Sequence, residues 1–476
     1  MSEPSADIQP TLAKVPSGIA GLDEITGGGL PAGRPTLVCG GPGSGKTLVA
    51  LSFLVNGARQ FGEPGVLVSF EECTAELASD VASLGFDVPG LIAEGKLFVD
   101  YVHIDRSEIE ETGEYDLEGL FVRLDHAVRS VGAKRVVLDT VESLFGGLSN
   151  ETILRTELRR LLRWLKDRNL TTVITGERGA QTLTRQGLEE YVTDAVILLD
   201  HRVRDELSTR RLRIVKYRGS FHGTNEYPFL IDREGVSVLP VTALKLDHPA
   251  PMQRVSSGVP LLDEILGGQG FYRGSTVLLS GTAGTGKTSL AASFADATCR
   301  RGERCAYFLL EESPQQLIRN MRSIGIDLGQ WSERGLLNLQ AERPSRFGLE
   351  AHLTAMYRAV AELQPQAVVV DSITDLLALG GETEVRAMLT RLIDYLKTRG
   401  VTVLFSSLSP GTVELQETQA GVSSLMDAWI LMSLERIGDE RRRQMSVLKV
   451  RGMQHSSRVY EFTMTERGFQ IVPPKG

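Results

Sequence analysis

Residues 17–47 read "SGIAGLDEITGGGLPAGRPTLVCGGPGSGKT", and residues 257–288 read "SGVPLLDEILGGQGFYRGSTVLLSGTAGTGKT". Three further stretches also occur twice in the same order: FEECTAEL with LEESPQQL, RVVLDTVESL with AVVVDSITDL, and VKYRGSFH with LKVRGMQH. Four similar stretches that occur in the same order in both halves of the chain indicate a duplicated domain. We predict an N-terminal tail at 1–13, a first domain at 14–240, a linker at 241–253 and a second domain at 254–476.

Each copy alternates short apolar runs with helical stretches. In the first copy the runs are PTLVCG, GVLVSF, RVVLDT, TTVITG and AVILLD. Continuous runs of this kind predict strands buried on both faces, and therefore a mainly parallel sheet covered by helices. The closing segments RRLRIVKYRG, YPFLID and VSVLP are expected to add antiparallel strands. The fold class is thus α/β, in two tandem copies.

Composition narrows the function classes. The 476 residues are 42% hydrophobic and 24% charged, with a net charge of -8, which is typical of a soluble globular protein and argues against a coat for nucleic acid. The four cysteines form no CxxC pair, so neither a zinc site nor a disulfide framework is expected. No stretch has the length and apolarity of a signal peptide or membrane span, and we expect a cytoplasmic protein.

Both copies contain the phosphate-binding pattern G-x-x-x-x-G-K-[ST], after a predicted strand and before a predicted helix. Its glycines let backbone N–H groups approach the phosphates, its lysine reaches the β- and γ-phosphates, and its threonine hydroxyl ligates Mg²⁺. ATP and Mg²⁺ are the expected ligands. The residues assigned to nucleotide binding here are Gly41, Gly43, Ser44, Gly45, Lys46, Thr47, Thr282, Gly284, Thr285, Gly286, Lys287 and Thr288.

One further predicted strand in each copy ends in an aspartate. Asp139 and Asp371 end the strands RVVLD and AVVVD, where a metal-side carboxylate belongs, and Thr47 and Thr288 complete the predicted metal sites. A strand-ending aspartate can instead simply cap the next helix.

Two glutamates follow another predicted strand in each copy: Glu71 and Glu72 in the first, Glu311 and Glu312 in the second. This position allows a carboxylate to orient or deprotonate a group that attacks the γ-phosphate, and we predict that these four are catalytic. The alternative is a helix N-terminus enriched in glutamate.

A basic motif, K-x-R-G-x-x-H, closes both copies. Its members are Lys216, Arg218 and His222 in the first copy and Lys449, Arg451 and His455 in the second. A solvated basic strand edge is the alternative. The repetition favours nucleotide binding, and because no partner for these cations is evident within the chain, we expect them to reach the ATP of a neighbouring subunit.

The duplicated phosphate loops, the glutamate pairs, the two basic motifs and the segment "SSLMD" resemble the KaiC family of RecA-like ATPases, over essentially the whole chain. The resemblance implies tandem RecA-like P-loop domains in a two-tiered ring of six identical chains, with ATP between subunits. It also implies a slow ATPase in the first half, and in the second an autokinase and autophosphatase of adjacent Ser and Thr residues, in a circadian or other timekeeping role.

The predicted acceptors are Ser423 and Ser424. When Asp194 is aligned with Asp427, these serines stand opposite Glu190 and Tyr191, which cannot accept phosphate as a serine does. The resemblance marks the two serine positions as the phosphoacceptors and marks Thr418 as a threonine that takes part in phosphate cycling. An ordinary polar turn is the alternative reading of the serine pair.

The chain departs from the family pattern at two places. The family has an arginine seven residues after the second metal-side aspartate, and Ala378 stands there, so we expect weaker retention of phosphate. The chain stops at "GFQIVPPKG", whereas clock-type members continue into a tail that binds KaiA. KaiA is therefore not an expected partner, while a KaiB-like protein is possible.

Two other functions stay open. A nucleic-acid-dependent ATPase of the RecA or DnaB type would need a basic loop with aromatic residues, and no such loop is evident. A signalling scaffold that uses ATP for assembly is the second, against which the intact glutamate pairs argue.

Overall fold

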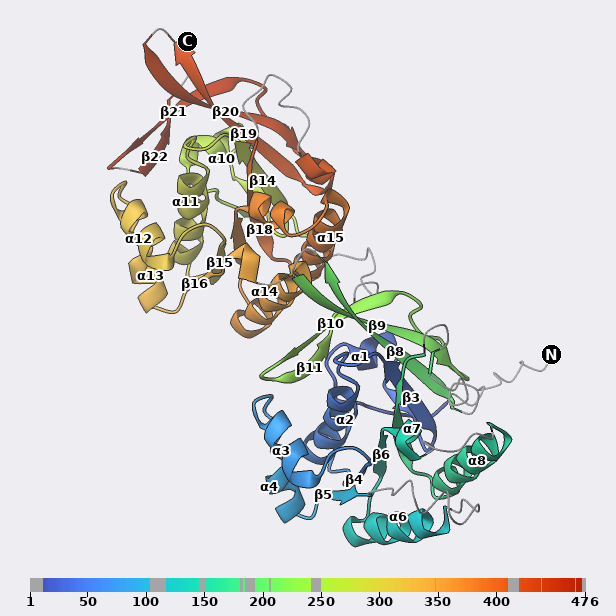
Figure 1. Cartoon of the computed structure of the whole chain (residues 1–476). Helices are drawn as coiled ribbons and strands as arrows, with labels where there is room; N and C mark the ends of the chain where they lie inside the picture. The colour runs from blue at the N-terminus through green and yellow to red at the C-terminus, as the bar shows by residue number, and fades with distance from the viewer. Residues whose placement is uncertain are drawn as a thin grey trace, which may run out of the picture. The chain divides into compact units, whose positions relative to one another are not determined.

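A computed structural model describes residues 12–102, 117–144, 151–179, 183–184, 193–204, 207–240, 250–346, 348–409, 419–437, 439–466 and 468–472. The chain divides into two compact units, residues 1–243 and 244–476. Each unit is described by itself (Figure 1). The predicted domain and linker limits stay predictions, because the linker residues 241–249 lie outside the described part.

The first unit alternates strands and helices up to β8 and closes with three further strands. Its elements are β1 (Lys14–Val15), α1 (Leu22–Ile25), β2 (Leu30–Pro31), β3 (Pro35–Gly40), α2 (Lys46–Gln60), β4 (Gly65–Ser69), α3 (Thr74–Ala82), α4 (Val88–Ala93), β5 (Leu97–Tyr101), α6 (Glu118–Val131), β6 (Arg135–Asp139), α7 (Val141–Leu144), α8 (Glu151–Asp167), β7 (Thr171–Glu177), β8 (Ala195–Arg204), β9 (Leu207–Tyr217), β10 (Glu226–Asp232) and β11 (Gly235–Val238).

The second unit repeats this order. Its elements are β12 (Arg254–Val255), α10 (Pro260–Ile265), β13 (Phe271–Tyr272), β14 (Thr276–Gly281), α11 (Lys287–Arg300), β15 (Cys305–Leu309), α12 (Pro314–Arg322), α13 (Gly329–Glu333), β16 (Leu337–Ala341), η1 (Pro344–Arg346), α14 (Leu349–Leu363), β17 (Ala367–Asp371), η2 (Ile373–Ala378), α15 (Glu382–Thr398), β18 (Thr402–Leu408), η3 (Gln419–Leu425), β19 (Ala428–Ile437), β20 (Glu440–Val450), β21 (Val459–Thr465) and β22 (Gly468–Ile471).

The two sheets have the same topology. The strand order is β5-β4-β6-β7-β3-β8-β9-β10-β11 in the first unit and β16-β15-β17-β18-β14-β19-β20-β21-β22 in the second. The strands from β5 to β8 pair in parallel, whereas β9, β10 and β11 are antiparallel. The predicted α/β class, the duplication and the antiparallel extension are confirmed. Strands β5 and β16 were not among the predicted runs.

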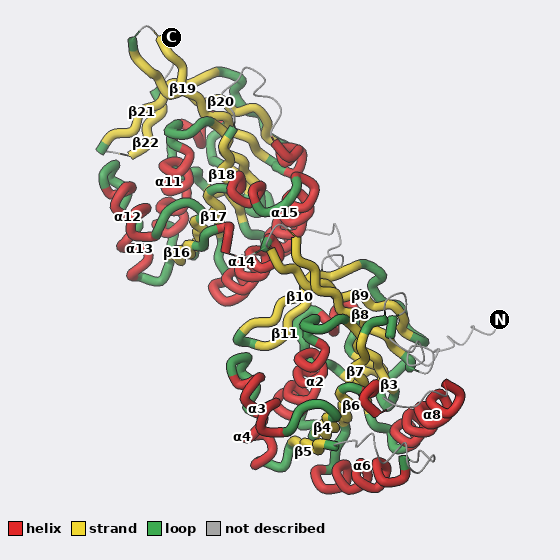
Figure 2. Tube along the Cα trace, viewed as in Figure 1, coloured by secondary structure: helices red, strands yellow, loops and turns green. Residues whose placement is uncertain are grey.

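Alternate residues of one strand enter different core layers. In β3, Val38 packs into the layer under α2, α3 and α4, while Leu37 and Cys39 pack into the layer under α6 and α8. Helices therefore cover both faces of the sheet, as Figures 1 and 2 show for each unit. A strand covered on both faces needs apolar residues at every position, which explains the continuous runs in the sequence. No helix in the described ranges is long and apolar enough to cross a membrane.

A fully buried arginine joins β6 to the rest of the first unit. Arg135 is 0% exposed. Its guanidinium donates to Glu63 at 2.7 Å, to the Phe53 carbonyl at 2.8 Å and to the Pro16 carbonyl at 2.9 Å. Gly57 provides the room, since a Cβ atom there would lie 2.4 Å from the Arg135 Cδ atom. Every side of the charge is thus satisfied by an ion pair or a carbonyl.

We predict that Arg135→Ala lowers the free energy of unfolding of the first unit by about 3 kcal/mol, because three hydrogen bonds and the partner of a half-buried carboxylate are lost. Urea dependence of hydrogen exchange in the β3 and β6 peptides measures this. The control is Arg129→Ala, which removes a 78% exposed arginine from an ion pair with Asp125 and should cost less than about 0.5 kcal/mol. Equal effects of the two changes would contradict the prediction.

Candidate active sites

Both phosphate loops join the sheet to a long helix. The first connects β3 to α2, and the second connects β14 to α11. Gly45 (φ 96°) and Gly286 (φ 102°) turn into these helices in the left-handed region, which favours glycine. A Cβ atom on Gly45 would lie 2.6 Å from the Ile231 side chain, so the loop also needs glycine for space. The predicted order of strand, glycine-rich loop and helix is confirmed in both units.

The loop lysines fold back over the loops. The Lys46 ammonium donates to the carbonyls of Gly40 at 2.9 Å and Gly41 at 3.2 Å. The Lys287 ammonium donates at 2.9 Å to the matching carbonyls of Gly281 and Thr282. A cation over the loop and the free N–H groups of the helix N-terminus together suit a triphosphate. The residues present therefore fit the expected nucleotide.

The strand-ending aspartates lie where a metal-side carboxylate is needed. Asp139 is buried and accepts hydrogen bonds from the hydroxyls of Thr175 and Thr47. Burial raises the pKa of Asp139, and these two hydrogen bonds offset part of that rise. Oxygen ligands from a threonine and an aspartate fit Mg²⁺, so Thr47 and Asp139 are the residues that would hold it in the first unit. Thr288 and Asp371 have the same places in the second unit.

Asp371 has a different set of partners from Asp139. The Ser406 hydroxyl donates to its Oδ1 atom, and the buried Tyr307 phenol donates to its Oδ2 atom at 3.0 Å. Burial raises the pKa of Tyr307 well above its usual value, and Asp371 adds to the rise, so the phenol keeps its proton. Leu67 is the matching residue in the first unit, so the sequence contained this difference, although nothing in it identified Asp371 as the partner.

The glutamate pairs follow β4 and β15, next to the aspartate strands. Ser69, at the end of β4, pairs in register with Asp139, so the carboxylates and the phosphate loop lie at the same edge of the sheet. The Ser143 hydroxyl donates to Glu71 at 2.9 Å. Burial and then Asp139 raise the pKa of Glu72. A carboxylate with a raised pKa beside a phosphate site is suited to take a proton.

In the second pair the pKa of both glutamates is raised. Burial and then Asp375 raise the pKa of Glu311, and burial and then Asp371 raise the pKa of Glu312. Asn320 donates to Glu312 at 3.3 Å. The structure thus brings each predicted glutamate pair together with its predicted aspartate.

The basic motifs lie at the other end of each sheet. Lys216 and Lys449 pair in register with the first residues of β8 and β19, which begin beside the N-terminal ends of β3 and β14. The six-residue strand β14 spans roughly 20 Å, so the motif is remote from the phosphate loop of its own unit.

The expectation that these cations have no partner within the chain is wrong. The Lys216 ammonium donates to the Thr193 carbonyl at 2.7 Å, and the Lys449 ammonium donates to the Ser423 carbonyl at 3.0 Å. Arg451 donates to the Ser424 carbonyl at 2.6 Å. Arg218 also interacts within the chain. Since lysine has three donors and arginine five, these contacts do not exclude a phosphate.

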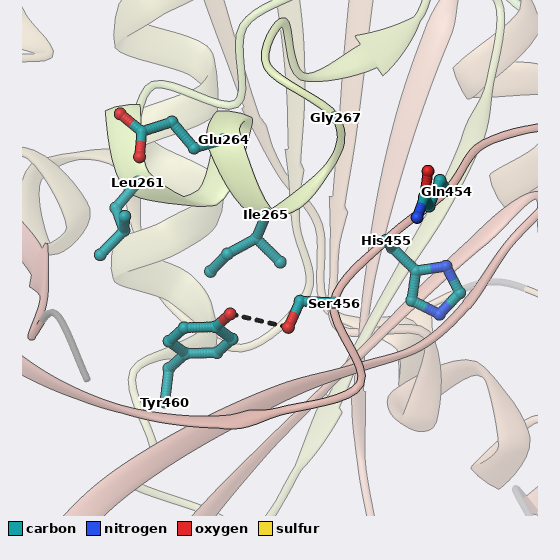
Figure 3. A pocket seen from close by; sticks show the side chains of 8 residues that line it. All are labelled: Leu261, Glu264, Ile265, Gly267, Gln454, His455, Ser456 and Tyr460. Carbon is teal, nitrogen blue, oxygen red and sulfur yellow. Dashed lines mark hydrogen bonds between the residues drawn. The ribbon is translucent and has the colours of Figure 1, made fainter. Parts of the chain in front are cut away.

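The two histidines lie in loops after β9 and β20. His222 stacks on Tyr217, with ring centroids 6.3 Å apart. His455 lines a cavity of about 500 Å³ between its loop and α10. Figure 3 shows His455 on one side of this cavity and Glu264 on the other, with the Tyr460 phenol donating to the Ser456 hydroxyl at 2.8 Å.

The predicted acceptors lie in η3, immediately before β19. The Ser424 side chain is exposed and that of Ser423 is half-buried. Ala428 at the start of β19 pairs with Val277, near the start of β14, so both serines lie at the end of the sheet opposite the phosphate loop. Glu190, Tyr191 and Thr418 lie outside the described residues.

Two contacts were missed by the sequence reasoning. Arg386 in α15 donates to the Ser424 hydroxyl at 3.3 Å, and Arg443 in β20 donates to the Gly284 carbonyl of the phosphate loop at 3.4 Å. Nothing in the sequence pairs Arg386 with Ser424. A signal existed for Arg443, since Arg210 has the matching position in the first unit.

A phosphate loop, a strand-ending aspartate and a glutamate pair at one edge of a parallel sheet, present twice, define a duplicated RecA-like P-loop ATPase. The family model "ATPase: KaiC" matches residues 15–243 and again residues 255–476. The chain belongs to the KaiC family.

Named relatives agree with this assignment. The chain is 52% identical to "Circadian clock protein KaiC2" of Synechocystis over 464 residues, which are 97% of this chain and 82% of that protein. It is 37% identical to "Circadian clock oscillator protein KaiC" of Parathermosynechococcus lividus, over 97% of this chain and 85% of that protein. It is 36% identical to the protein of the same name from Synechococcus elongatus, over 97% of this chain and 89% of that protein.

We predict that Tyr307→Phe lowers the free energy of unfolding of the second unit by about 2 kcal/mol, because a buried carboxylate loses a hydrogen-bond donor. Tyr395→Phe is the matched control. It removes a phenol that donates to a neutral carbonyl, that of Tyr357, at 3.2 Å, and should cost about 1 kcal/mol or less. Hydrogen exchange in urea measures both, and an equal or smaller loss for Tyr307→Phe would refute the role given to its hydroxyl.

Proposed function

We propose that this chain forms a hexameric ATPase whose second half also phosphorylates its own Ser423 and Ser424. The observation that carries the proposal is the position of the serines at the end of the sheet opposite the phosphate loop of the same unit. A γ-phosphate on that loop is out of their reach, whereas a second copy of the chain can present one. Phosphoryl transfer between subunits is therefore the reaction that fits this geometry.

In the first half the proposed reaction is hydrolysis. Lys46 and the loop N–H groups bind the triphosphate. Thr47 and Asp139 would hold Mg²⁺, which would neutralise part of the charge of the phosphates. Glu71 and Glu72 orient the attacking water and take its proton, as the bond from water oxygen to phosphorus forms and the bond to the ADP oxygen breaks.

In the second half the attacking group is a serine hydroxyl. Glu311 or Glu312 takes the proton from Oγ, the γ-phosphoryl group moves to Oγ, and ADP leaves with the bridging oxygen. Lys287 and the loop bind the phosphates, and Thr288 with Asp371 would hold Mg²⁺. The same step run in reverse breaks the bond from Oγ to phosphorus, returns the phosphoryl group to ADP and forms ATP, so the same residues serve dephosphorylation.

The basic motifs are proposed to complete the site of the next subunit. Lys216, Arg218 and His222 serve the first half, and Lys449, Arg451 and His455 serve the second. Their distance from the phosphate loop of their own unit supports this assignment. ATP bound between chains adds binding energy to the assembled form alone, so nucleotide should favour the ring.

The names of the relatives motivate the wider role. Since these relatives are named circadian clock proteins, we propose that the phosphorylation state of Ser423 and Ser424 serves timekeeping or a related signal. A KaiB-like protein is the partner we propose for the first half.

Replacing Glu71 and Glu72 with Gln should remove most steady-state ATP hydrolysis and leave phosphorylation of the serines intact, because an amide keeps the shape of the side chain but cannot take a proton. Phosphate release measures the first effect and phosphopeptide mass spectrometry the second. Unchanged hydrolysis in the double variant would assign the ATPase activity elsewhere.

In the unmodified protein, the raised pKa of Glu72 predicts that acidification stops hydrolysis at a pH above the ordinary glutamate pKa of about 4.3.

Replacing Ser423 and Ser424 with Ala should abolish phosphate incorporation from Mg-ATP and spare ATP hydrolysis by the first half. The reason is that the substitution removes only the acceptor oxygens. Radiolabel that persists at the unmodified level would move the acceptor assignment to another residue, with Thr418 the first to examine.

Transfer between subunits can be separated from transfer within one chain by mixing variants. Lys287→Ala keeps both serines but loses the phosphate-loop lysine, and the Ser423→Ala, Ser424→Ala chain keeps the lysine but loses the acceptors. Each alone should take no label. Rings that contain both, made by co-expression, should carry phosphate on the Lys287→Ala chain. Mixed rings without label would exclude transfer between subunits.

A further inference from the structure

Ser424 and Ser423 differ in their surroundings. The Ser424 hydroxyl donates to the Gly421 carbonyl at 2.9 Å and accepts from the Arg386 Nη2 atom at 3.3 Å. For the Ser423 hydroxyl, no hydrogen bond occurs among the described residues. One of the two adjacent hydroxyls thus has a cation against it, and the other does not.

The guanidinium of Arg386 is free to serve an anion. It makes no ion pair among the described residues, and both Arg386 and Ser424 are exposed, so their contact lies at the surface of the unit. Gly421 (φ 55°) brings η3 close, since a Cβ atom there would lie 3.2 Å from the Arg386 Nη1 atom. Helix α15 therefore presents a guanidinium to η3 before any phosphate is attached.

The other cations near the serines already have partners. Lys397 pairs with Asp427 at 2.8 Å, and Lys449 and Arg451 donate to the backbone carbonyls of the two serines. Arg451 is also 3.6 Å from Asp427, the carboxylate beside this group. Among the cations that the structure describes here, Arg386 is thus the one in contact with a serine side chain.

We propose that Arg386 binds the phosphoryl group of phosphorylated Ser424 and thereby slows the loss of that phosphate. The inference rests on the proposed function for the source of phosphate. A phosphoserine carries nearly two negative charges, which convert the weak contact of a hydroxyl with Arg386 into a charge-assisted, bidentate one. The family arginine near the phosphosites is replaced here by Ala378, which carries no charge. Arg386, from α15, provides a positive charge instead.

The test follows phosphate loss at each serine separately. The full-length protein is phosphorylated with Mg-ATP, ATP is then consumed with hexokinase and glucose, and phosphopeptides are quantified over time. Arg386→Gln should accelerate loss from Ser424 roughly tenfold and change loss from Ser423 less than about twofold. The control is Arg399→Gln, at the opposite end of α15, roughly 20 Å away, which should behave like the unmodified protein. Equal rates at Ser424 with and without Arg386 would overturn the proposal.

A second measurement does not need the kinase. Phosphoserine is incorporated at position 424 during translation, and the melting temperature is compared with that of the Ser424 protein, in the Arg386 and Arg386→Gln backgrounds. Phosphate should raise the melting temperature only when Arg386 is present, and the same shift in both backgrounds would refute the contact. If the unmodified protein takes up no phosphate from Mg-ATP, the proposed function fails, while this comparison still decides the role of Arg386.

Discussion

In each unit, the strand that leads into the phosphate loop determines which residues can lie near that loop. In the second unit, β14 runs from the end of the sheet near Ser423 and Ser424 to the phosphate loop, with β18 and β19 hydrogen-bonded along both sides. Because β14 is hydrogen-bonded to a neighbour along both edges, its length is fixed. The distance between the phosphate loop at its end and the serines near its start is therefore fixed as well. In the first unit β3 imposes the same separation on its loop and basic motif. Within each unit these parts therefore lie at opposite ends of the sheet and cannot meet.

The side chains that donate hydrogen bonds to the strand-ending aspartate are not the same in the two units. Asp139 is held by two threonine hydroxyls, whereas Asp371 is held by a serine and a buried phenol. Burial raises the pKa of Glu72 in the first unit and of Glu311 and Glu312 in the second. The hydroxyls of Thr175 and Ser406 stand at matching positions, so the buried phenol of Tyr307 is the contact that distinguishes the second unit.

The sequence predicted the parts that depend on local pattern. Phosphate loops need glycines at set spacing, and doubly buried strands need unbroken apolar runs, so both could be recognised. Strand β5 could not, because it lies at the edge of its sheet and its residues after Leu97 are only half-buried. Arg386 and Ser424 are 38 residues apart and meet only because η3 packs on α15. The carbonyl partners of Lys216 and Lys449 were missed because every residue has a carbonyl, and only the fold selects one.

The buried Arg135 has a consequence for how the two halves of the gene diverge. Its glutamate partner Glu63 has a counterpart, Glu303, which instead pairs with Arg273. Thr298 and Ala367 occupy the positions of Gly57 and Arg135. Copying Thr298 alone into the first half would place a side chain inside the space of a guanidinium. An exchange of sequence between the two repeats therefore preserves the packing around Arg135 only when it carries both positions together.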